Sequence, residues 1–341
     1  MPHRFAFLET SPGTVVLGRG PFEKSPDRPT GNDQTAFYID NFAGSSLTPW
    51  WVPASVEVLT PDDIWPFKPG PKIAQPSWEE APDLDAFTPV FDEVARTIRE
   101  GRAEKMVPVL PHRATWPNLE NHLLSALEQS REWQWRYALV GDEQGAGHCG
   151  VTPELLFRID GDLLETMAVA GTTRRDDEQA FIEDAKEIRE HELVVSFLES
   201  TLAAFGEVER EPRGLIRVGG VTHFRSPISV RLHTQPDITE LIRALHPTPA
   251  VGCLPRDAAL SDQLLELRDR VGCPDQFGAP MGLLHDGQFH AVIAIRGMFW
   301  RGDEVILPTG CGLIEESRLE DEIAEHELKR QAVRRIFGLK G

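Results

Sequence analysis

Two pairs of glutamates have the spacing in this sequence that most directly suggests chemistry. Glu187 and Glu190 are three residues apart in one stretch with helical character, and Glu322 and Glu325 repeat that spacing in another. Residues at i and i+3 share one face of a helix, so each pair would present two carboxylates on the same side. Oxygen ligands with retained waters suit Mg²⁺. Two such helices could meet around a magnesium ion, although spacing alone favours an ordinary solvated face.

A second candidate is the glycine-rich segment of residues 308–314, which follows an expected strand and precedes an expected helix. Gly310 and Gly312 would let backbone N–H groups approach a carboxylate or phosphate closely. The segment lacks the further glycine of a dinucleotide-binding fingerprint. A tight turn would explain the glycines equally well, so both an anion site and a simple turn stay open.

Three helices are expected to position these residues. The clearest spans about residues 84–100, where apolar residues recur at three- and four-residue spacing and Gly101 follows as a stop. Longer helical stretches are expected at 178–205 and at 319–337. Each of these two carries one of the glutamate pairs.

Strands are expected between the helices. Residues 106–110 form a short apolar run typical of a buried strand, with Lys105 at its entrance, although Pro108 interrupts it. Residues 155–159 and 163–169 predict a hairpin around an Asp-Gly turn. Further strand-rich stretches are expected at 137–140, 221–233 and 289–307.

The order of these elements favours an α+β architecture in layers over a regular βαβ alternation, because strands group in hairpins with long helices between them. Residues 1–80 are rich in proline, glycine and tryptophan, and we expect short strands and loops there. We expect residues 81–341 to form the catalytic region and residues 1–80 to belong to the same structural domain.

Composition narrows the possible functions. The 341 residues are 40% hydrophobic and 26% charged, which is typical of a folded protein. A formal net charge of −19 repels phosphate backbones and argues against nucleic acid as a partner. Apolar runs stop short of the ~18–20 residues of a membrane span, and no secretory signal is evident. The four cysteines form no C-x-x-C motif and are expected to be reduced, in a cytoplasmic protein.

Taken together, these segments resemble the chorismate-utilising family, which contains isochorismate synthases, salicylate synthases, anthranilate synthase large subunits and aminodeoxychorismate synthases. The resemblance runs from about residue 105 to residue 337, and its seven stretches occur in the family's order. They are TPELL at 152–156, AGT at 170–172, KEIREH at 186–191, HPTPAVG at 246–252, IR at 295–296, GCGLIEES at 310–317 and E-x-x-E-x-x-x-K at 322–329. The fold that this resemblance implies is a two-layer β sandwich flanked by helices, with the active site between the sheets.

The resemblance also implies a metal site and a substrate site. Glu190 and Glu325 would ligate Mg²⁺, and Glu187 and Glu322 would support them through water. Chorismate carries two carboxylates, so a heavily acidic protein must supply cations and amide donors locally. The expected contacts are Lys329 with the amides of Gly171 and Thr172 for the ring carboxylate, and Arg296 with the amides around Gly310 and Gly312 for the enolpyruvyl carboxylate. On position alone, an arginine paired to a structural acid is the alternative for Arg296.

Two residues would carry the reaction. Isochorismate synthesis needs a water activated at C2 and an acid for the departing C4 hydroxyl. Lys105 stands where the water-using members carry their general-base lysine, and Glu154 would be the general acid. Burial would favour the neutral amine and the protonated carboxyl. The alternatives are an exposed lysine after a loop and a turn carboxylate beside Pro153.

Three further positions bear on the choice of reaction. Ala170 stands where aminodeoxychorismate synthases place a nucleophilic lysine, which argues against a covalent intermediate. Ala250 and its neighbours are closer to isochorismate synthases than to the salicylate or anthranilate branches. His223 occupies the place of a family histidine near the ring, with a packed core histidine as the alternative. We therefore expect a Mg²⁺-dependent isochorismate synthase acting on chorismate, without nucleic acid or membrane, as a monomer or weak homo-oligomer.

Several departures from the family pattern keep neighbouring reactions open. Cys311 replaces an alanine between the glycines, Cys253 is also unusual, and Phe277 stands where several members have tyrosine. The alternatives are salicylate synthesis, amination to an anthranilate-type product, or a catalytically silent chorismate-binding relative. Isochorismate could serve menaquinone or siderophore biosynthesis, and the sequence favours neither pathway.

Overall fold

The computed structural model describes residues 4–31, 34–60, 63, 65–67, 75–129, 135–141 and 145–339. Its helices are α1 (Leu84–Arg99), α2 (Leu119–Gln129), α3 (Glu178–Phe181), α4 (Ala185–Leu202), α5 (Ile238–Leu245), α6 (Ala258–Arg270) and α7 (Leu319–Ile336), with a 3-10 turn η1 at Arg175–Asp177. Its strands are β1 (Phe5–Ser11), β2 (Thr14–Ser25), β3 (Ala36–Ile39), β4 (Trp50–Leu59), β5 (Ser77–Trp78), β6 (Lys105–Met106), β7 (Val109–Thr115), β8 (Trp135–Val140), β9 (Ala146–Thr152), β10 (Leu155–Asp160), β11 (Leu163–Arg174), β12 (Gly206–Arg210), β13 (Gly214–Val218), β14 (Val221–Leu232), β15 (Cys253–Leu254), β16 (Pro280–His285), β17 (Gln288–Ile293), β18 (Gly297–Arg301) and β19 (Glu304–Gly310).

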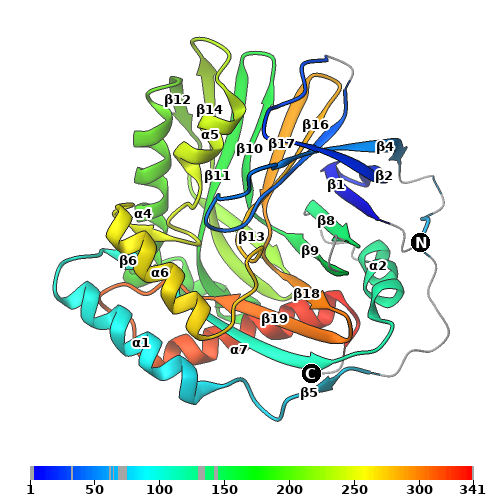
Figure 1. Cartoon of the computed structure of the whole chain (residues 1–341). Helices are drawn as coiled ribbons and strands as arrows, with labels where there is room; N and C mark the ends of the chain where they lie inside the picture. The colour runs from blue at the N-terminus through cyan, green and yellow to red at the C-terminus, as the bar shows by residue number, and fades with distance from the viewer. Residues whose placement is uncertain are drawn as a thin grey trace.

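Seventeen of these strands form one continuous antiparallel sheet. From one end, β12 and β13 both pair with β14, and the ladder continues through β11, β10, β17, β16 and β3 to β4. It then passes through β2, β1, β8, β9, β18 and β19 to β7 and β5. In Figure 1 the strands around β10, β11 and β17 stand upright, whereas β18 and β19 cross below them. The layered α+β class expected from the sequence is confirmed.

Helix α7 connects the two arms of this long sheet. It contacts β19 in one arm and both β11 and β14 in the other. Helix α4 packs against β11 and β14 as well, and helices α4, α5 and α6 follow one another along the left side of the view in Figure 1. The helices that carry the two glutamate pairs therefore pack against the same two strands.

The expected hairpin of β10 and β11 and the helices α1 and α7 agree with the sequence pattern to within a few residues at each end. Helix α1 begins after Asp83, whose carboxylate accepts a hydrogen bond from the N–H of Ala86. It buries the apolar stripe that includes Phe87, Phe91 and Val94. Among the first strands, β3 and β5 are short as expected, but β2 and β4 contain 12 and 10 residues. That residues 81–341 form the catalytic region, with residues 1–80 as part of the same structural domain, stays a prediction.

The helix expected over residues 178–205 is instead two helices, α3 and α4. Asp184 lies between them with extended backbone angles, and its carboxylate accepts a hydrogen bond from the N–H of Glu187 at 3.1 Å. A capping side chain satisfies a free N–H and marks a new helix N-terminus. The break places Glu187 in the first turn of α4, where the helix dipole favours a negative charge.

The strand expected over residues 106–110 is also divided. β6 ends at Met106 and pairs with β15 in a separate two-stranded sheet, whereas β7 begins at Val109 and pairs with β19 in the large sheet. Pro108 lies between them, and proline has no N–H to donate to a ladder. Lys105 consequently belongs to the small sheet, whose other strand, β15, contacts α6.

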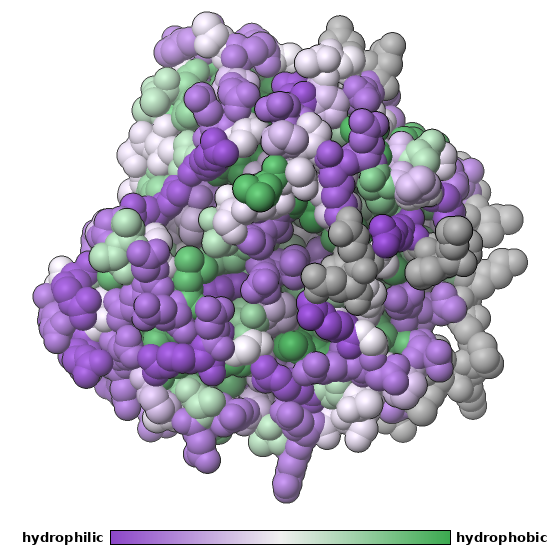
Figure 2. Space-filling view, in the orientation of Figure 1, coloured by the Kyte–Doolittle hydropathy of each residue, from purple (hydrophilic) through white to green (hydrophobic). Residues whose placement is uncertain are grey.

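The face of the molecule in Figure 2 is mostly hydrophilic, with apolar residues in small separate spots. Helices α1, α4, α5 and α6 contribute their buried apolar residues to one core together with β10, β11 and β14. None of the helices in the described ranges is long and apolar enough to cross a membrane. The large apolar side chains that remain exposed are Leu47, Val56, Val58, Leu84, Leu163 and Ile182.

Candidate active site

One cleft contains every residue that the sequence predicted to bind substrate. Its walls come from β11, β14 and β19, from the loops before β10, after α5 and between β17 and β18, and from helices α4 and α7. The predicted residues that line it are Glu154, Gly171, Thr172, Glu190, His223, Ala250, Arg296, Gly310, Gly312 and Lys329. The apolar part of the wall includes Val107, Val169, Val251, Phe277 and Ile295. The remaining predicted residues, Lys105, Glu187, Glu322 and Glu325, lie next to this lining.

The two glutamate pairs meet at one end of the cleft, which we call the carboxylate end (Glu187, Glu190, Glu322 and Glu325). The ammonium of Lys186 on α4 lies 3.0 Å from Glu322 on α7 and 3.6 Å from Glu187 on its own helix. One cation therefore touches both pairs. The other contacts are Lys105 Nζ to Glu190 at 2.9 Å, Lys329 Nζ to Glu325 at 2.6 Å, and the N–H of Thr172 to Glu187 at 2.8 Å.

Burial and crowding change the acidity of these carboxyl groups. Burial raises the pKa of Glu187, and the nearby charges of Glu190 and Glu325 raise it further. Burial also raises the pKa of Glu322, with an additional effect from Glu325. Burial would raise the pKa of Glu325 too, but Lys329 and its hydrogen bond outweigh that effect and lower it. The carboxylate end thus has four carboxyl groups but only three lysine partners among the described residues, Lys105, Lys186 and Lys329.

The donor set of the carboxylate end fits a hard divalent cation such as Mg²⁺. Carboxylate oxygens are the ligands that this ion prefers. Glu322 is fully buried, and its Oε2 has no hydrogen-bond partner in the described part of the chain. A buried polar atom without a partner is costly, and a cation would satisfy it. The residues present therefore fit the metal that the family resemblance implies.

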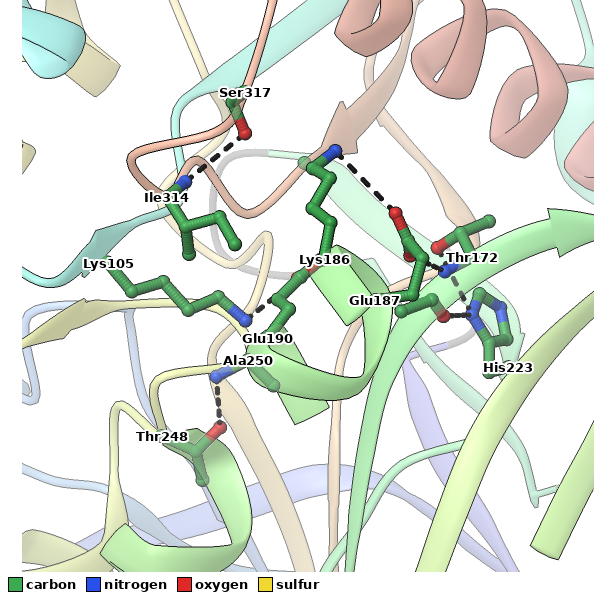
Figure 3. A network of polar contacts seen from close by, with 12 residues as sticks. Lys105, Thr172, Lys186, Glu187, Glu190, His223, Thr248, Ala250, Ile314 and Ser317 are labelled. Atoms are coloured by element: carbon green, nitrogen blue, oxygen red, sulfur yellow. Dashed lines mark hydrogen bonds and ion pairs between the residues drawn. The ribbon is translucent and has the colours of Figure 1, made fainter. Parts of the chain in front are cut away.

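Lys105 is fully buried, so the exposed-lysine alternative is wrong. β6 holds its backbone against β15, and its side chain extends to Glu190, as Figure 3 shows. The contact is an ion pair without the angles of a hydrogen bond, because Nζ has no hydrogen-bond partner among the described residues. A side chain at Gly312 would collide with both Glu190 and Lys105. Lys105 thus lies directly behind the lining residues Glu190 and Gly312.

Glu154 lies in the tight connection from β9 to β10, and its side chain is buried at 4% exposure. Burial raises the pKa of this carboxyl to about 7, even though Thr248, Lys105, Lys329 and Arg296 act in the opposite direction. The Thr248 hydroxyl donates to Glu154 at 3.2 Å. Glu154 is therefore a turn residue beside Pro153 whose carboxyl can carry a proton near neutral pH.

Arg296 and His223 form the opposite part of the lining, which we call the arginine end. Arg296 is buried with φ at +55°, a left-handed conformation that is uncommon for arginine. Its Nη2 lies 2.6 Å from His223 Nε2, and its Nη1 is buried without a hydrogen-bond partner in the described residues. Its hydrogen-bond partner is thus a histidine, and the alternative of an arginine paired to a structural acid is wrong.

The hydrogen bonds of His223 define its state. Its Nδ1 lies 2.7 Å from the carbonyl oxygen of Gly171, so Nδ1 donates and Nε2 accepts from Arg296. Burial and the charge of Arg296 hold the pKa of His223 well below its usual range. A neutral His223 is therefore an acceptor that orients the Arg296 guanidinium, and it lines the cleft in addition to being buried.

Glycines supply the close backbone approaches in this cleft. Gly171 has φ at +73°, and an added Cβ would meet the Glu187 carboxylate at 3.2 Å. Lys329 donates to the carbonyl oxygen of Gly310 at 2.7 Å, which holds its ammonium beside the cleft. Both glycine segments therefore do more than form a turn, because side chains there would displace charged groups.

Two residues of the site were missed in the sequence analysis. Lys186 immediately precedes Glu187, so its position in the KEIREH segment was a usable signal, but its partner Glu322 is 136 residues away. Thr248 lies within the HPTPAVG segment, where only Ala250 was assigned. The Thr248 hydroxyl contacts both Glu154 and the N–H of Ala250.

Comparisons with known proteins identify relatives of this chain. A sequence model of the family described as "chorismate binding enzyme" matches residues 66–338. The chain is 36% identical over 204 residues to the salicylate biosynthesis isochorismate synthase of Pseudomonas aeruginosa, covering 56% of this chain and 42% of that protein. It is 28% identical over 292 residues to isochorismate synthase MenF of Bacillus subtilis, covering 81% and 59%. The chain thus spans about half the length of these curated relatives.

Solved structures share the fold. The menaquinone-specific isochorismate synthase MenF of Escherichia coli superimposes with a TM-score of 0.83 at 21% identity, over 99% of this chain and 89% of that one. Anthranilate synthase component I of Streptococcus pneumoniae gives 0.66 at 14% identity, over 98% and 92%. The family match extends over most of the sequence and includes every residue of the cleft. The chain belongs to the chorismate binding enzyme family.

Proposed function

We propose that this protein is a Mg²⁺-dependent isochorismate synthase, which adds water at C2 of chorismate and removes the C4 hydroxyl. The observation that carries the proposal is the combination of a buried lysine and a buried acid at one cleft. Lys105 is fully buried beside Glu190, and Glu154 has a pKa of about 7. A base and an acid are what the exchange of a hydroxyl between two carbons requires.

The proposed substrate contacts follow the charges of the cleft. The Arg296 Nη1 is buried without a hydrogen-bond partner in the described ranges and would bind the enolpyruvyl carboxylate, together with backbone amides near Gly310 and Gly312. Lys329 and the amides of Gly171 and Thr172 would hold the ring carboxylate. Because the Thr172 N–H now donates to Glu187, it must leave that carboxylate when the substrate binds.

Glu190 and Glu325 would hold Mg²⁺, with Glu187 and Glu322 in support. When bound, the ion supplies the positive charge that a dianionic substrate needs in a protein with a formal charge of −19. The lysines now paired to these carboxylates would be released from them. Lys329 would then be free to contact the ring carboxylate.

Two residues accept and donate the protons of the proposed reaction. Lys105, released from its ion pair with Glu190 and having lost its proton to solvent, would accept a proton as a water oxygen bonds to C2. Both ring double bonds then shift by one position toward C4. Glu154 donates its proton to the C4 hydroxyl, whose C–O bond breaks, so that the hydroxyl leaves as water. One water enters and one leaves, so product and substrate are isomers. Ala170 offers no nucleophile in the lining, which agrees with a reaction without a covalent enzyme intermediate.

The proposal is tested by identifying the product. Purified protein is incubated with chorismate and Mg²⁺, with and without ammonium, and the products are separated by chromatography. We expect isochorismate in both cases. A dominant aminated product or salicylate would assign another reaction, and chorismate binding without turnover at several pH values would indicate a silent relative. We also propose a cytoplasmic location, because all four cysteines are free thiols.

A further inference from the structure

We propose that Cys311 is a sulfur ligand of the divalent-cation site, so that this site also binds thiophilic cations such as Co²⁺, Zn²⁺ and Cd²⁺. The inference rests on the proposed function in one respect, namely that the carboxylate end holds a metal. It adds a ligand that the family resemblance does not supply, because the corresponding position there is an alanine.

The position of the thiol supports this assignment. Cys311 lies directly after β19, between Gly310 and Gly312, and is fully buried. Its Sγ and one carboxylate oxygen each from Glu322 and Glu325 all lie within 4.8 Å of one another. Metal–sulfur and metal–oxygen bonds are ~2.0–2.3 Å long, so two ligand atoms on opposite sides of one ion lie a similar distance apart. The three atoms can therefore reach one cation with small adjustments.

A second observation points to a missing cation at the same place. One oxygen of Glu322 accepts from Lys186, but Oε2 is buried without a partner in the described chain. Because this residue is fully buried, water from the bulk cannot replace that partner freely. A cation bound by Cys311 and Glu325 would satisfy the free oxygen.

The other cysteines provide the contrast. Cys149, Cys253 and Cys273 are also buried free thiols, but in the described residues only Cys311 lies within such a group of metal-binding side chains. A buried cysteine without this setting behaves as a small apolar residue. Sulfur favours softer cations, whereas Mg²⁺ gains little from it. Binding forms a metal–sulfur bond and releases the thiol proton to solvent, without electron transfer.

The test is a titration of the metal-free, full-length protein with Co²⁺, followed by absorption spectroscopy. A thiolate ligand gives a sulfur-to-cobalt charge-transfer band in the near ultraviolet, which carboxylates alone do not give. We expect the band in the wild-type protein and in Cys149→Ala, a matched buried cysteine in β9. We expect Cys311→Ala and Cys311→Ser to lose it, and Glu325→Gln to weaken it.

Affinity provides the second measurement. We expect Cys311→Ala to weaken Cd²⁺ binding by roughly tenfold or more and to change Mg²⁺ binding by less than about twofold, because the lost ligand is soft. Circular dichroism identifies any variant that fails to fold, and Cys311→Ser then serves as the isosteric replacement. A band that persists in either Cys311 variant overturns the inference, as does a cobalt-loaded wild-type protein without the band. A protein that shows the band but makes no isochorismate refutes the proposed function and leaves this inference standing.

Discussion

The carboxylate end and the arginine end of the cleft differ in how their buried charges are compensated. At the carboxylate end, Glu190 and Glu325 each have a lysine partner supplied by the protein itself. At the arginine end, the hydrogen-bond partner of the Arg296 side chain is the neutral His223, and Nη1 has no partner among the described residues. Buried charges without partners are costly.

This difference explains what each end can bind. At the carboxylate end the lysines already pair with most of the carboxylates, although Glu322 Oε2 has no hydrogen-bond partner in the described part of the chain; a metal cation could take the place of those lysines. The arginine end is completed only when an anion arrives from outside the chain. A cleft with both features suits a ligand with negative charges at two places, one that the proposed metal would hold and one that Arg296 would hold.

The largest expected effect is on catalysis, at the buried acid Glu154 that lines the cleft. Glu154→Gln cannot donate the proton that the departing hydroxyl requires. We expect kcat to fall by about 10²–10⁴-fold with chorismate binding nearly unchanged, since general acid catalysis contributes on that order. Steady-state kinetics and calorimetric binding of chorismate would measure the two quantities. A variant with wild-type kcat would remove Glu154 from the mechanism.

Lys105→Gln tests whether this lysine does more than neutralise the carboxylate end. We expect a loss of kcat of roughly 10²–10⁴-fold while chorismate still binds. Lys186→Gln is the matched control, because it removes an ammonium paired with Glu322 at the same end. Its loss of kcat should be much smaller. If both variants lose the same activity, Lys105 acts only as a counter-charge.

Arg296→Met at the arginine end and Lys329→Met at the carboxylate end should have opposite effects on stability. We expect KM for chorismate to rise by about 10–100-fold, because a charge-assisted hydrogen bond contributes roughly 1.5–3 kcal/mol. The free energy of unfolding without ligand should stay the same or increase, because an incompletely paired buried cation is removed.

Lys329→Met provides the contrast, because it leaves Glu325 without its ion-pair partner. We expect it to destabilise the ligand-free protein by about 3–5 kcal/mol. Urea denaturation of both variants measures the difference. Equal destabilisation would mean that the two ends do not differ in compensation.

The pH profile of kcat should depend on Glu154. Its pKa is raised from an ordinary value to about 7 by burial, and an acid acts only while protonated, so kcat should fall as the pH rises above about 7. Thr248 donates a hydrogen bond that favours the ionised carboxylate. Thr248→Val should therefore raise this pKa and move the fall of kcat to higher pH. A shift to lower pH, or no shift, would contradict the assignment.

The smallest effect expected is stabilisation by Mg²⁺. Glu187 and Glu322 have pKa values raised by burial in the folded state, so the folded protein binds their protons more tightly than the unfolded chain does. Their contribution to stability is present at low pH and is lost as the pH rises through the raised values. Mg²⁺ at 100-fold its Kd should increase the free energy of unfolding by about 2.7 kcal/mol. The accompanying rise in Tm should be larger at pH 8 than at pH 5.5. Glu325→Gln should abolish the increase in differential scanning calorimetry.

Local patterns in the sequence were enough to predict much of the fold. The i, i+3 spacing of the glutamates predicted that each pair shares a helix face. Apolar periodicity located α1, and the helix expected at 319–337 agrees closely with α7. The split at Asp184 was missed because a capping aspartate looks like any polar helix residue until its partner N–H is known. The strand break at Pro108 could be seen, but not that the chain passes there from one sheet to another.

The contacts of the site are mostly long-range and could not be predicted from spacing. Lys186 and Glu322 meet across 136 residues, and Arg296 meets His223 across 73. The assignment of Glu154, Arg296 and Lys329 came from resemblance to a family. The charge states of these residues depend on their burial. Burial is known only from the three-dimensional structure, in which the two arms of the sheet pack against α7.

The most direct test of the account is the source of the new hydroxyl oxygen. The protein is incubated with chorismate and Mg²⁺ in ¹⁸O-labelled water, and the product is isolated and analysed by mass spectrometry. If the two ends of the cleft hold chorismate for attack by water at C2, isochorismate carries a single ¹⁸O atom in its ring hydroxyl. Unlabelled isochorismate, or a product without a C2 hydroxyl, would contradict the account.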